Sequence, residues 1–403
     1  MTGYLERITG IVPHTNKSVD IVLNGKNLII TGGNGSGKTS FLRSVYEKTV
    51  LLIINKKQAD LPELQKSLQL KKQQLNDNKK GTTSYDNALW AVNNIQNEIE
   101  SIENGLQLVI PNNIYFSSKY DDRKAVIKYF EDNRLSEIIE AKTAQGLQTE
   151  IEQNRKVTHD QNVGNNLEQH LLNLKTRRSL AITEDKNQVI ADTINIWFEE
   201  FEKNLKHLFE DNSTKLLFYS NDNKFTIQQD GKPPYTFQTL SAGYRAIFDV
   251  YADLFMRTKY FSISPQELEG IVFIDEIDSH LHISLQRLIL PFFTESFPKI
   301  QFIVTTHSPF VLMSTKDILV YDLGKDEPYS ISQVKSQNRI LREYLGVPTS
   351  MPVWAERSLD EILNKYMNRE PDDIILAELK KELINAGLEE YFPDAATKIM
   401  ETK

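Results

Sequence analysis

The sequence of 403 residues contains no cysteine. This absence excludes disulfide bonds, thiolate metal sites and a cysteine nucleophile, and it agrees with a reducing compartment. No run approaches the roughly 20 consecutive apolar residues of a membrane-spanning helix. The longest runs, such as Val50–Ile54 and Ile271–Ile274, suit the core of a strand or a helix. The N-terminal segment has no basic stretch followed by an apolar one, so we expect no secretion signal, no membrane contact and a cytoplasmic location.

The chain also lacks an excess of positive charge. Its 55 acidic residues outnumber its 47 lysines and arginines, which leaves a formal net charge of −8. Recognition of nucleic acid would therefore need a local basic patch. With 40% hydrophobic and 25% charged residues, the composition is that of an ordinary globular protein. A chain of this length can bury a large core, and we expect two or three subdomains.

A glycine-rich loop follows a short apolar run near the N-terminus. Asn27–Thr31 predicts a strand, and Ser40–Ile54 predicts a helix beyond the loop. The loop satisfies G-x-x-x-x-G-K-[ST], a pattern in which backbone N–H groups and a helix N-terminus bind phosphate. Lys38 is expected to contact the β- and γ-phosphates of ATP, and the Thr39 hydroxyl to bind Mg²⁺. The predicted nucleotide-binding residues of this loop are Gly32, Gly33, Asn34, Gly35, Ser36, Gly37, Lys38, Thr39 and Ser40.

A second apolar run, Gly270–Ile274, ends in two adjacent carboxylates. A buried strand presents the residues that follow it at the carboxyl edge of a sheet, where nucleotide sites form. We expect Asp275 to hold Mg²⁺ and Glu276 to polarise the attacking water as general base. An apolar run that ends in Asp-Glu is common by itself. Downstream of a phosphate-binding loop, however, such a run indicates a site for Mg²⁺ and nucleotide.

Two further segments resemble motifs of the ABC-type ATPases. Leu240–Arg245 (LSAGYR) is similar to the family's signature LSGGQ. The resemblance implies that Ser241 and Gly243 bind the γ-phosphate of ATP held by the opposite subunit. A helix over Tyr244–Met256 that Ser241 merely caps is the simpler interpretation, and both can hold. His307, in the sequence TTHSP, resembles the switch histidine that contacts the γ-phosphate, although a lone histidine is more often structural.

The segment after Glu276 narrows the resemblance. Ile277–His282 fits the D-E-x-x-x-x-L-H pattern of ABC ATPases outside the transporters, in the SMC, RecF and OLD nuclease group. Within that group the motifs resemble the anti-phage ATPases PtuA of the Septu and retron systems and AriA of the PARIS system. His280 and His282 also invite a metal site. Because no acidic or cysteine partner lies at ligand spacing, a packing or interface role is favoured.

The resemblance carries expectations about fold, cofactors and assembly. It implies an α/β fold: an ABC-type P-loop ATPase head with a mixed sheet flanked by helices, a short coiled-coil insertion and helical lobes. ATP and Mg²⁺ are the implied cofactors, and Lys38, Glu276 and His307 the implied catalytic residues. A homodimer or higher homo-oligomer would close on ATP, because each site needs the signature of the opposite subunit.

Residues 56–108 change in composition and are rich in Lys, Gln, Asn and Glu. Apolar residues recur at heptad-like spacing on two limbs that meet near Gly81–Ser84. This predicts an antiparallel coiled-coil hairpin with limbs of roughly 37 Å, or else a helical pair packed on the globular body. The lysine-rich first limb could contact the phosphates of nucleic acid. A solvated helix face explains such a charge run more simply.

The remaining segments complete the expected organisation. Val109–Ser118 predicts a strand, 121–215 reads as mostly helical, and Leu216–Gln229 predicts a hairpin. No glutamine follows the strand predicted at Asn113–Ser118, so the γ-phosphate sensor of the ABC family, its Q-loop, has no assignment. The amphipathic segments Leu359–Tyr366 and Asp372–Leu388 either pack on the ATPase or dock a partner. The expected domains are 1–55 (first part of the head), 56–108 (arm), 109–235 (helical lobe), 236–330 (second part of the head) and 331–403 (helical C-terminal region).

Three biological roles follow from the resemblance. The first is a sensor or regulatory ATPase of an anti-phage system. Because the segment after His307 is short for a fused Toprim nuclease and shows no D-x-D or H-N-H cluster, that role implies a separate nuclease or toxin effector. The second is an SMC/RecF-like DNA-maintenance or repair ATPase, which the arm weakly favours. The third is the nucleotide-binding subunit of a transporter. The missing Q-loop glutamine, the L-H sequence and the arm argue against it.

Overall fold

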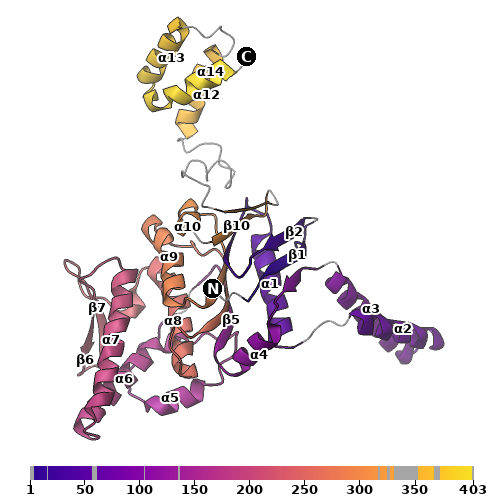
Figure 1. The fold of residues 1–403 in the computed structure, drawn as a ribbon, viewed down its shortest axis with the longest axis vertical. Coiled ribbons are helices and arrows are strands. Elements are labelled where there is room, and N and C mark those ends of the chain that lie inside the picture. Colours follow the sequence, from indigo (N-terminus) through magenta and orange to yellow (C-terminus); the bar gives the residue numbers. More distant parts are fainter. Residues whose placement is uncertain are drawn as a thin grey trace. The chain divides into compact units, whose positions relative to one another are not determined.

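The protein is described from a computed structural model. It covers residues 4–15, 17–56, 61–103, 105–134, 137–315, 318–324, 327–330, 353–366 and 373–401. Two compact units divide the chain, Met1–Lys335 and Ser336–Lys403 (Figure 1). The finer division into five domains stays a prediction.

A mixed sheet forms the centre of the first unit. Among the described residues it contains six strands in the order β11-β10-β3-β9-β8-β5. Five of them run parallel, and β11 pairs antiparallel with β10 at one edge. The strands are β3 (Asn27–Thr31), β5 (Ala125–Phe130), β8 (Glu269–Ile274), β9 (Ile300–Thr305), β10 (Ile318–Asp322) and β11 (Glu327–Ser330). The predicted α/β fold with a mixed sheet is confirmed.

The inner strands are buried on both faces, because helices cover the sheet from both sides. Every residue of β9 is buried, as are all but the first of β3 and β8, which explains their continuous apolar sequences. Figure 1 shows α1 (Lys38–Ile53) and α4 (Asn113–Asp121) on one side of the sheet, with α8 (Ala242–Phe261) and α9 (Ile283–Ser296) on the other. The strands predicted at 27–31 and 270–274 are confirmed.

The strand predicted over Val109–Ser118 is wrong beyond its first residue. The strand β4 (Gln107–Val109) pairs with β1 (Arg7–Ile11), which also pairs with β2 (Ser18–Val22), and the chain then turns into α4. Phe116 stacks on Tyr4 with ring centroids 3.8 Å apart, and the Ser117 hydroxyl donates to the Ile53 carbonyl at 2.8 Å. These tertiary contacts bury one helical face, and they outweigh the apolar, aromatic composition that suggested a strand.

The region 121–215, which is polar and was predicted to be mostly helical, also contains a strand. β5 lies within it, and the helices that follow are α5 (Leu147–Asn154), α6 (Leu167–Thr183) and α7 (Gln188–Leu208). Lys128 sits in the middle of β5 and is 4% exposed. Its amine donates to the carbonyls of Asp160 and Gln161 at 3.2 and 2.9 Å. The predicted hairpin is confirmed as β6 (Lys215–Tyr219) and β7 (Lys224–Gln228).

The arm is a pair of helices, α2 (Leu61–Asp77) and α3 (Thr83–Glu103), that pack against each other. Ala88, Val92 and Ile99 of α3 are buried, whereas Lys66, Lys72, Lys79 and Lys80 are exposed. Lys57 lies outside the described residues. The coiled-coil geometry and the contact with nucleic acid stay predictions.

The second unit has its own apolar core. It consists of α12 (Val353–Tyr366), α13 (Asp373–Asn385) and α14 (Phe392–Glu401). Leu359, Leu379, Leu383 and Ile399 are among the buried residues of this core, whereas Ile374 of α13 is 68% exposed. Asp372, the first residue of the second predicted amphipathic segment, lies outside the described residues. No helix in the described part of the chain is long and apolar enough to cross a membrane.

Candidate functional site

The predicted phosphate-binding loop joins β3 to α1. Gly32, Gly35 and Gly37 have φ angles of 140°, 75° and 91°, which side chains other than glycine rarely adopt. At position 32 a Cβ atom would also lie 2.9 Å from the Ser36 hydroxyl and 3.2 Å from the backbone nitrogen of Gly324. The loop therefore needs glycine for both backbone conformation and space.

Lys38, the first residue of α1, is folded against this loop. It is 7% exposed, and its amine donates to the carbonyls of Gly32 and Gly33, both at 3.2 Å. Burial lowers the pKa of the Lys38 amine, while Glu276, Asp275 and Asp278 act in the opposite direction. The charge of Lys38 thus interacts electrostatically with the predicted Mg²⁺ ligand Asp275 and the predicted base Glu276.

Asp275 and Glu276 follow β8 directly, as the apolar run predicted. Asp275 is 3% exposed, accepts a hydrogen bond from the Thr305 hydroxyl of β9, and lies 3.4 Å from the Tyr129 hydroxyl. The Glu276 N–H donates to the same Thr305 oxygen at 2.7 Å. The Asp275 carboxylate and the hydroxyl of Thr39, an exposed residue of α1, are oxygen donors of the type that Mg²⁺ prefers.

Glu276 adopts a left-handed backbone conformation, with φ at 42°. Such a conformation costs a residue with a side chain about 1 kcal/mol or more and persists where surrounding contacts fix it. One of these contacts comes from Arg134, which sequence analysis did not single out. Its guanidinium donates to the carbonyls of Asp275, Glu276 and Ile277 at 2.8, 2.9 and 3.2 Å. No local signal marks this arginine, because it lies in a polar turn far upstream.

His307 follows β9 and is half-buried near the same carboxyl edge. Burial lowers the pKa of its imidazole, and Lys38 lowers it further, whereas Asp278 and Glu276 raise it. The neutral form therefore dominates near pH 7. Its neighbour Thr306 donates from its backbone to the Ile30 carbonyl at 3.1 Å and from its hydroxyl to Asp278. The structure thus groups His307 electrostatically with Lys38 and Glu276.

The signature residues lie at the start of α8. Ser241 is the exposed N-cap residue, but its side chain makes no capping hydrogen bond. Gly243 is buried, and a Cβ atom there would lie 3.0 Å from the His280 carbonyl. Among the described residues, no hydrogen bond or ion pair joins Ser241 or Gly243 to the phosphate loop of the same chain. The two halves of the predicted nucleotide site are therefore not brought together by these contacts.

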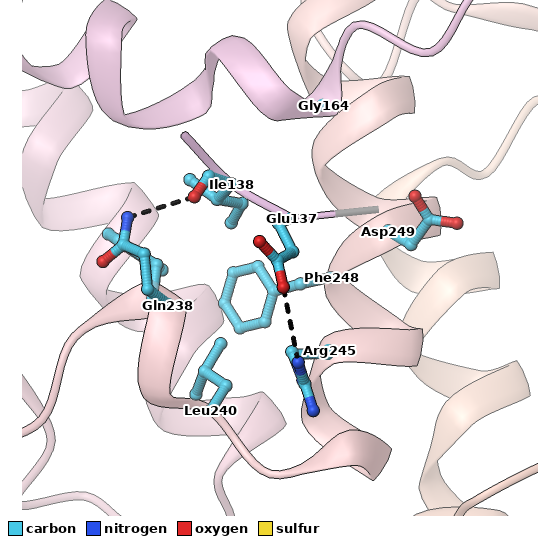
Figure 2. A pocket seen from close by; sticks show the side chains of 9 residues that line it. Glu137, Ile138, Gly164, Gln238, Leu240, Arg245, Phe248 and Asp249 are labelled. Atoms are coloured by element: carbon cyan, nitrogen blue, oxygen red, sulfur yellow. Dashed lines mark hydrogen bonds and ion pairs between the residues drawn. The ribbon is translucent and has the colours of Figure 1, made fainter. Parts of the chain in front are cut away.

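A narrow pocket lies beside the signature segment (Figure 2). Leu240, Arg245 and Asp249 line it from the α8 side, opposite Glu137 and Ile138. The guanidinium of Arg245 lies 3.9 Å from the Glu137 carboxylate. The pocket has room for about one water molecule, with a volume of roughly 10 Å³. It is too small for a nucleotide, so the nucleotide site must be sought at the phosphate loop.

The two histidines after Glu276 have local roles. His280 has a φ of 63°, and its carbonyl faces Gly243. His282 is the N-cap residue of α9, and its Nδ1 accepts the Ser284 N–H at 3.4 Å. In the described residues, no group of three or more metal-ligating side chains comes together. Both side chains are exposed, and the packing or interface role stays a prediction.

The unassigned Q-loop is explained by the corrected strand. β5, not Asn113–Ser118, lies beside β8 in the sheet. The segment after β5 is Glu131-Asp132-Asn133-Arg134 and contains no glutamine. Arg134 of this segment, and not a glutamine, therefore contacts the backbone of Asp275 and Glu276.

Comparison with known proteins gives a family for this arrangement. The family model "AAA domain, putative AbiEii toxin, Type IV TA system" matches residues 28–314. "Retron Ec83 probable ATPase" of Escherichia coli is 32% identical over 171 residues, covering 36% of this chain and 31% of that protein. "Septu protein PtuA" of Bacillus thuringiensis is 26% identical over 189 residues, covering 45% of this chain and 46% of that protein. The predicted resemblance to retron and Septu ATPases is confirmed, although the chain spans less than half the length of these relatives.

Two solved structures align with the chain at low TM-scores. An SMC head bound to the C-terminal winged-helix domain of ScpA aligns with a TM-score of 0.38 and 16% identity, covering 82% of this chain and all of that one. The SMC head domain of Thermotoga maritima gives a TM-score of 0.35 and 12% identity, with 78% and 94% coverage.

Proposed function

Because the chain belongs to the AAA-domain family whose model matches residues 28–314, an ATPase family, we propose that it hydrolyses ATP at sites shared by two copies of the chain. The observation that carries this proposal is the convergence of Lys38, Asp275, Glu276 and His307 at one edge of the sheet. The exposed signature Ser241 stands apart, with no hydrogen bond to the phosphate loop within the described chain. An arrangement of this kind is completed by a second copy.

Each residue has a role that its surroundings support. Lys38 and the backbone N–H groups of the loop bind the phosphates. Thr39 and Asp275 would hold Mg²⁺, which when bound neutralises phosphate charge. Glu276 orients the attacking water and accepts its proton at the carboxylate. The neutral His307 donates a hydrogen bond to the γ-phosphate. Ser241, free of capping, donates to the γ-phosphate of the ATP held by the other copy.

The test is the substitution Glu276→Gln, which keeps the shape of the side chain and removes the base. ATP turnover is expected to fall by a factor of about 10² to 10⁴, while ATP binding persists and the ATP-bound dimer accumulates in size-exclusion chromatography with light scattering. Glu295→Gln is a matched control, since its carboxylate is largely exposed and interacts only weakly with His207. A Glu276→Gln protein with wild-type turnover would contradict the proposal, and chelation of Mg²⁺ should abolish turnover of the wild type.

For the biological role we propose a sensor or regulatory ATPase of a bacterial anti-phage system, acting on a separate nuclease or toxin. The support is the similarity to "Retron Ec83 probable ATPase" and "Septu protein PtuA". An effector that co-purifies with the chain and separates from it when ATP is hydrolysed is the expected result. Full purification of the chain from its native host without any effector would argue against this role.

A DNA-maintenance or repair ATPase is the second candidate. The exposed lysines of the arm favour it: Lys66 and Lys72 lie in α2, and Lys79 and Lys80 lie between α2 and α3. Duplex DNA binding that needs ATP and weakens steeply with salt would support it. Substitution of Lys66, Lys72, Lys79 and Lys80 by glutamine would then reduce the salt dependence of binding.

A further inference from the structure

We propose that Arg134 is the positioning residue for Glu276, which it acts on by holding the backbone turn of this general base. The inference rests on the proposed ATPase function and deepens it. It assigns the segment after β5 a task that the sequence left open, namely to set the orientation of the base.

The first support is the contact between Arg134 and the turn. Arg134 is 4% exposed. Its Nη1 donates to the carbonyl of Asp275, and its Nη2 donates to those of Glu276 and Ile277, at distances from 2.8 to 3.2 Å. A planar guanidinium can serve several acceptors in a fixed geometry, whereas a lysine amine cannot hold them in the same way. The three carbonyls flank the left-handed Glu276, so this contact fixes the direction of its side chain.

The second support is the charge that faces Arg134. Burial lowers the pKa of the Arg134 guanidinium, and Asp249 of α8 is the largest influence in the opposite direction, ahead of Asp278, Asp132 and Asp275. Asp249 is 8% exposed. It lies on the same helix as Ser241, about two turns further along. Carboxylates around the buried guanidinium thus favour its charged form, which can donate to all three carbonyls.

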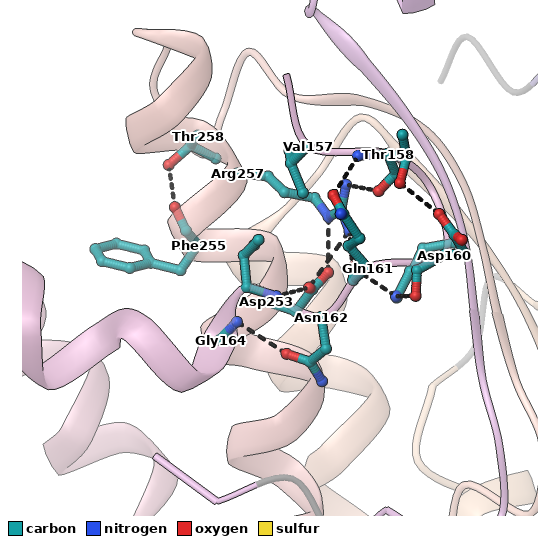
Figure 3. Close-up of polar contacts among 12 residues, drawn as sticks. Val157, Thr158, Asp160, Gln161, Asn162, Gly164, Asp253, Phe255, Arg257 and Thr258 are labelled. Atoms are coloured by element: carbon teal, nitrogen blue, oxygen red, sulfur yellow. Dashed lines mark hydrogen bonds and ion pairs between the residues drawn. The ribbon is translucent and has the colours of Figure 1, made fainter. Parts of the chain in front are cut away.

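A separate loop, 157–164, is bound to the signature helix α8 (Figure 3). The Asn162 amide donates to Asp249 at 2.7 Å. Arg257 of α8 donates to the carbonyls of Thr158 and Gln161 and to Asp253. Asp253 in turn accepts the Val163 N–H at 2.8 Å. These contacts involve neither Arg134 nor the turn of Glu276.

The loop residues also offer a matched control. Arg257 is 2% exposed and, like Arg134, donates to backbone carbonyls. Its acceptors lie in the loop 157–164 and not in the turn of Glu276. If Arg134 were merely a buried structural arginine, its replacement would act like the replacement of Arg257.

The experiment compares Arg134→Lys and Arg257→Lys in the full-length chain. For Arg134→Lys we expect kcat to fall by a factor of about 10 to 100, while the Kd for a fluorescent ADP analogue changes less than about threefold. Both variants should lower the midpoint of thermal unfolding by similar amounts. Arg257→Lys should nevertheless keep kcat within about threefold of the wild type. Equal kcat for Arg134→Lys and wild type, or equal losses of kcat for the two variants, would overturn the inference.

A double-mutant cycle with Glu276→Gln separates positioning from general damage. A residue that acts through Glu276 has no further effect once the base is removed. Arg134→Lys should therefore leave the residual turnover of Glu276→Gln unchanged within about threefold. A further loss equal to that of the single variant would assign Arg134 a merely structural role.

The two proposals fail in distinguishable ways. If Glu276→Gln turns over ATP like the wild type, the proposed ATPase site itself is wrong. If Glu276→Gln is inactive and Arg134→Lys is fully active, the ATPase site stands and only the positioning role of Arg134 falls.

Discussion

Thr305 at the end of β9 donates its hydroxyl hydrogen to Asp275 beyond the end of β8, and the same oxygen accepts the backbone N–H of Glu276. One hydroxyl thus connects the predicted Mg²⁺ ligand to the predicted base. The parallel pairing of β8 and β9 brings these groups to the same level of the sheet. The orientation of both carboxylates therefore depends on a residue of the neighbouring strand.

Replacement of Thr305 by valine should damage both stability and turnover. Thr305→Val leaves a buried carboxylate and a backbone N–H without their partner, which we expect to cost about 1–3 kcal/mol of unfolding free energy and at least tenfold in kcat. Urea unfolding and steady-state ATPase assays measure the two effects. Thr31→Val is the matched control, because the buried Thr31 hydroxyl of β3 has no hydrogen-bond partner in the part of the chain that the structure describes. Equal effects of the two variants would contradict the role of Thr305.

Shared sites predict complementation between two inactive proteins. Lys38→Met removes the phosphate-binding amine, and Ser241→Arg blocks the signature at the start of α8. In a mixed dimer one site carries both defects and the other carries none. Equal mixing should therefore restore roughly one quarter of wild-type turnover, since about half of the dimers are mixed and each has one intact site. Mixtures as inactive as their components would show that each chain builds its site alone.

Gly270 of β8 is expected to tolerate no side chain. Its φ is 136°, and a Cβ atom would lie 1.9 Å from the Val126 carbonyl of β5. Gly270→Ala should therefore force the two strands apart and lower the unfolding free energy by about 3 kcal/mol or more. Gly33→Ala provides the contrast in unfolding, because nothing lies within 4 Å of its Cβ position. A Gly270→Ala protein as stable as Gly33→Ala would show that the strands can separate at little cost.

Lys259 should make stability depend on pH in the alkaline range. Burial lowers its pKa to about 8 from the usual lysine value of 10.5, and its amine lies over the rings of Trp197 and Phe255. Below pH 8 the folded state carries the full free-energy cost of burying the protonated Lys259 amine. This cost is relieved as the pH rises towards 10.5, because the folded state then releases its proton first. Relative to Lys259→Met, the unfolding free energy of the wild type should rise by about 1–2 kcal/mol between pH 7.5 and pH 10. A difference in unfolding free energy between the wild type and Lys259→Met that does not change with pH would contradict this prediction.

The sequence revealed those parts of the site that depend on local pattern. The loop Gly32–Thr39 lies between a strand and a helix and the acidic pair follows the strand over Gly270–Ile274, as the sequence predicted, because glycine spacing and buried apolar strands are properties of short segments. The roles of these residues stay predictions. β5 was missed, since Lys128 interrupts its apolar pattern and is satisfied by carbonyls of a loop more than thirty residues away. Arg134 was missed for a similar reason. Its acceptors lie about 140 positions along the chain, and its own neighbours form an ordinary polar turn.

The C-terminal helices α12, α13 and α14 bury their apolar residues among themselves, in a unit separate from Met1–Lys335. A segment with its own core can melt as its own cooperative step, so calorimetry of the full chain can show two transitions instead of one. The three tryptophans divide accordingly, with Trp90 and Trp197 in the first unit and Trp354 in α12. Replacing Trp354 with phenylalanine would make tryptophan fluorescence report on the ATPase unit alone, and each unfolding free energy would then belong to a single transition.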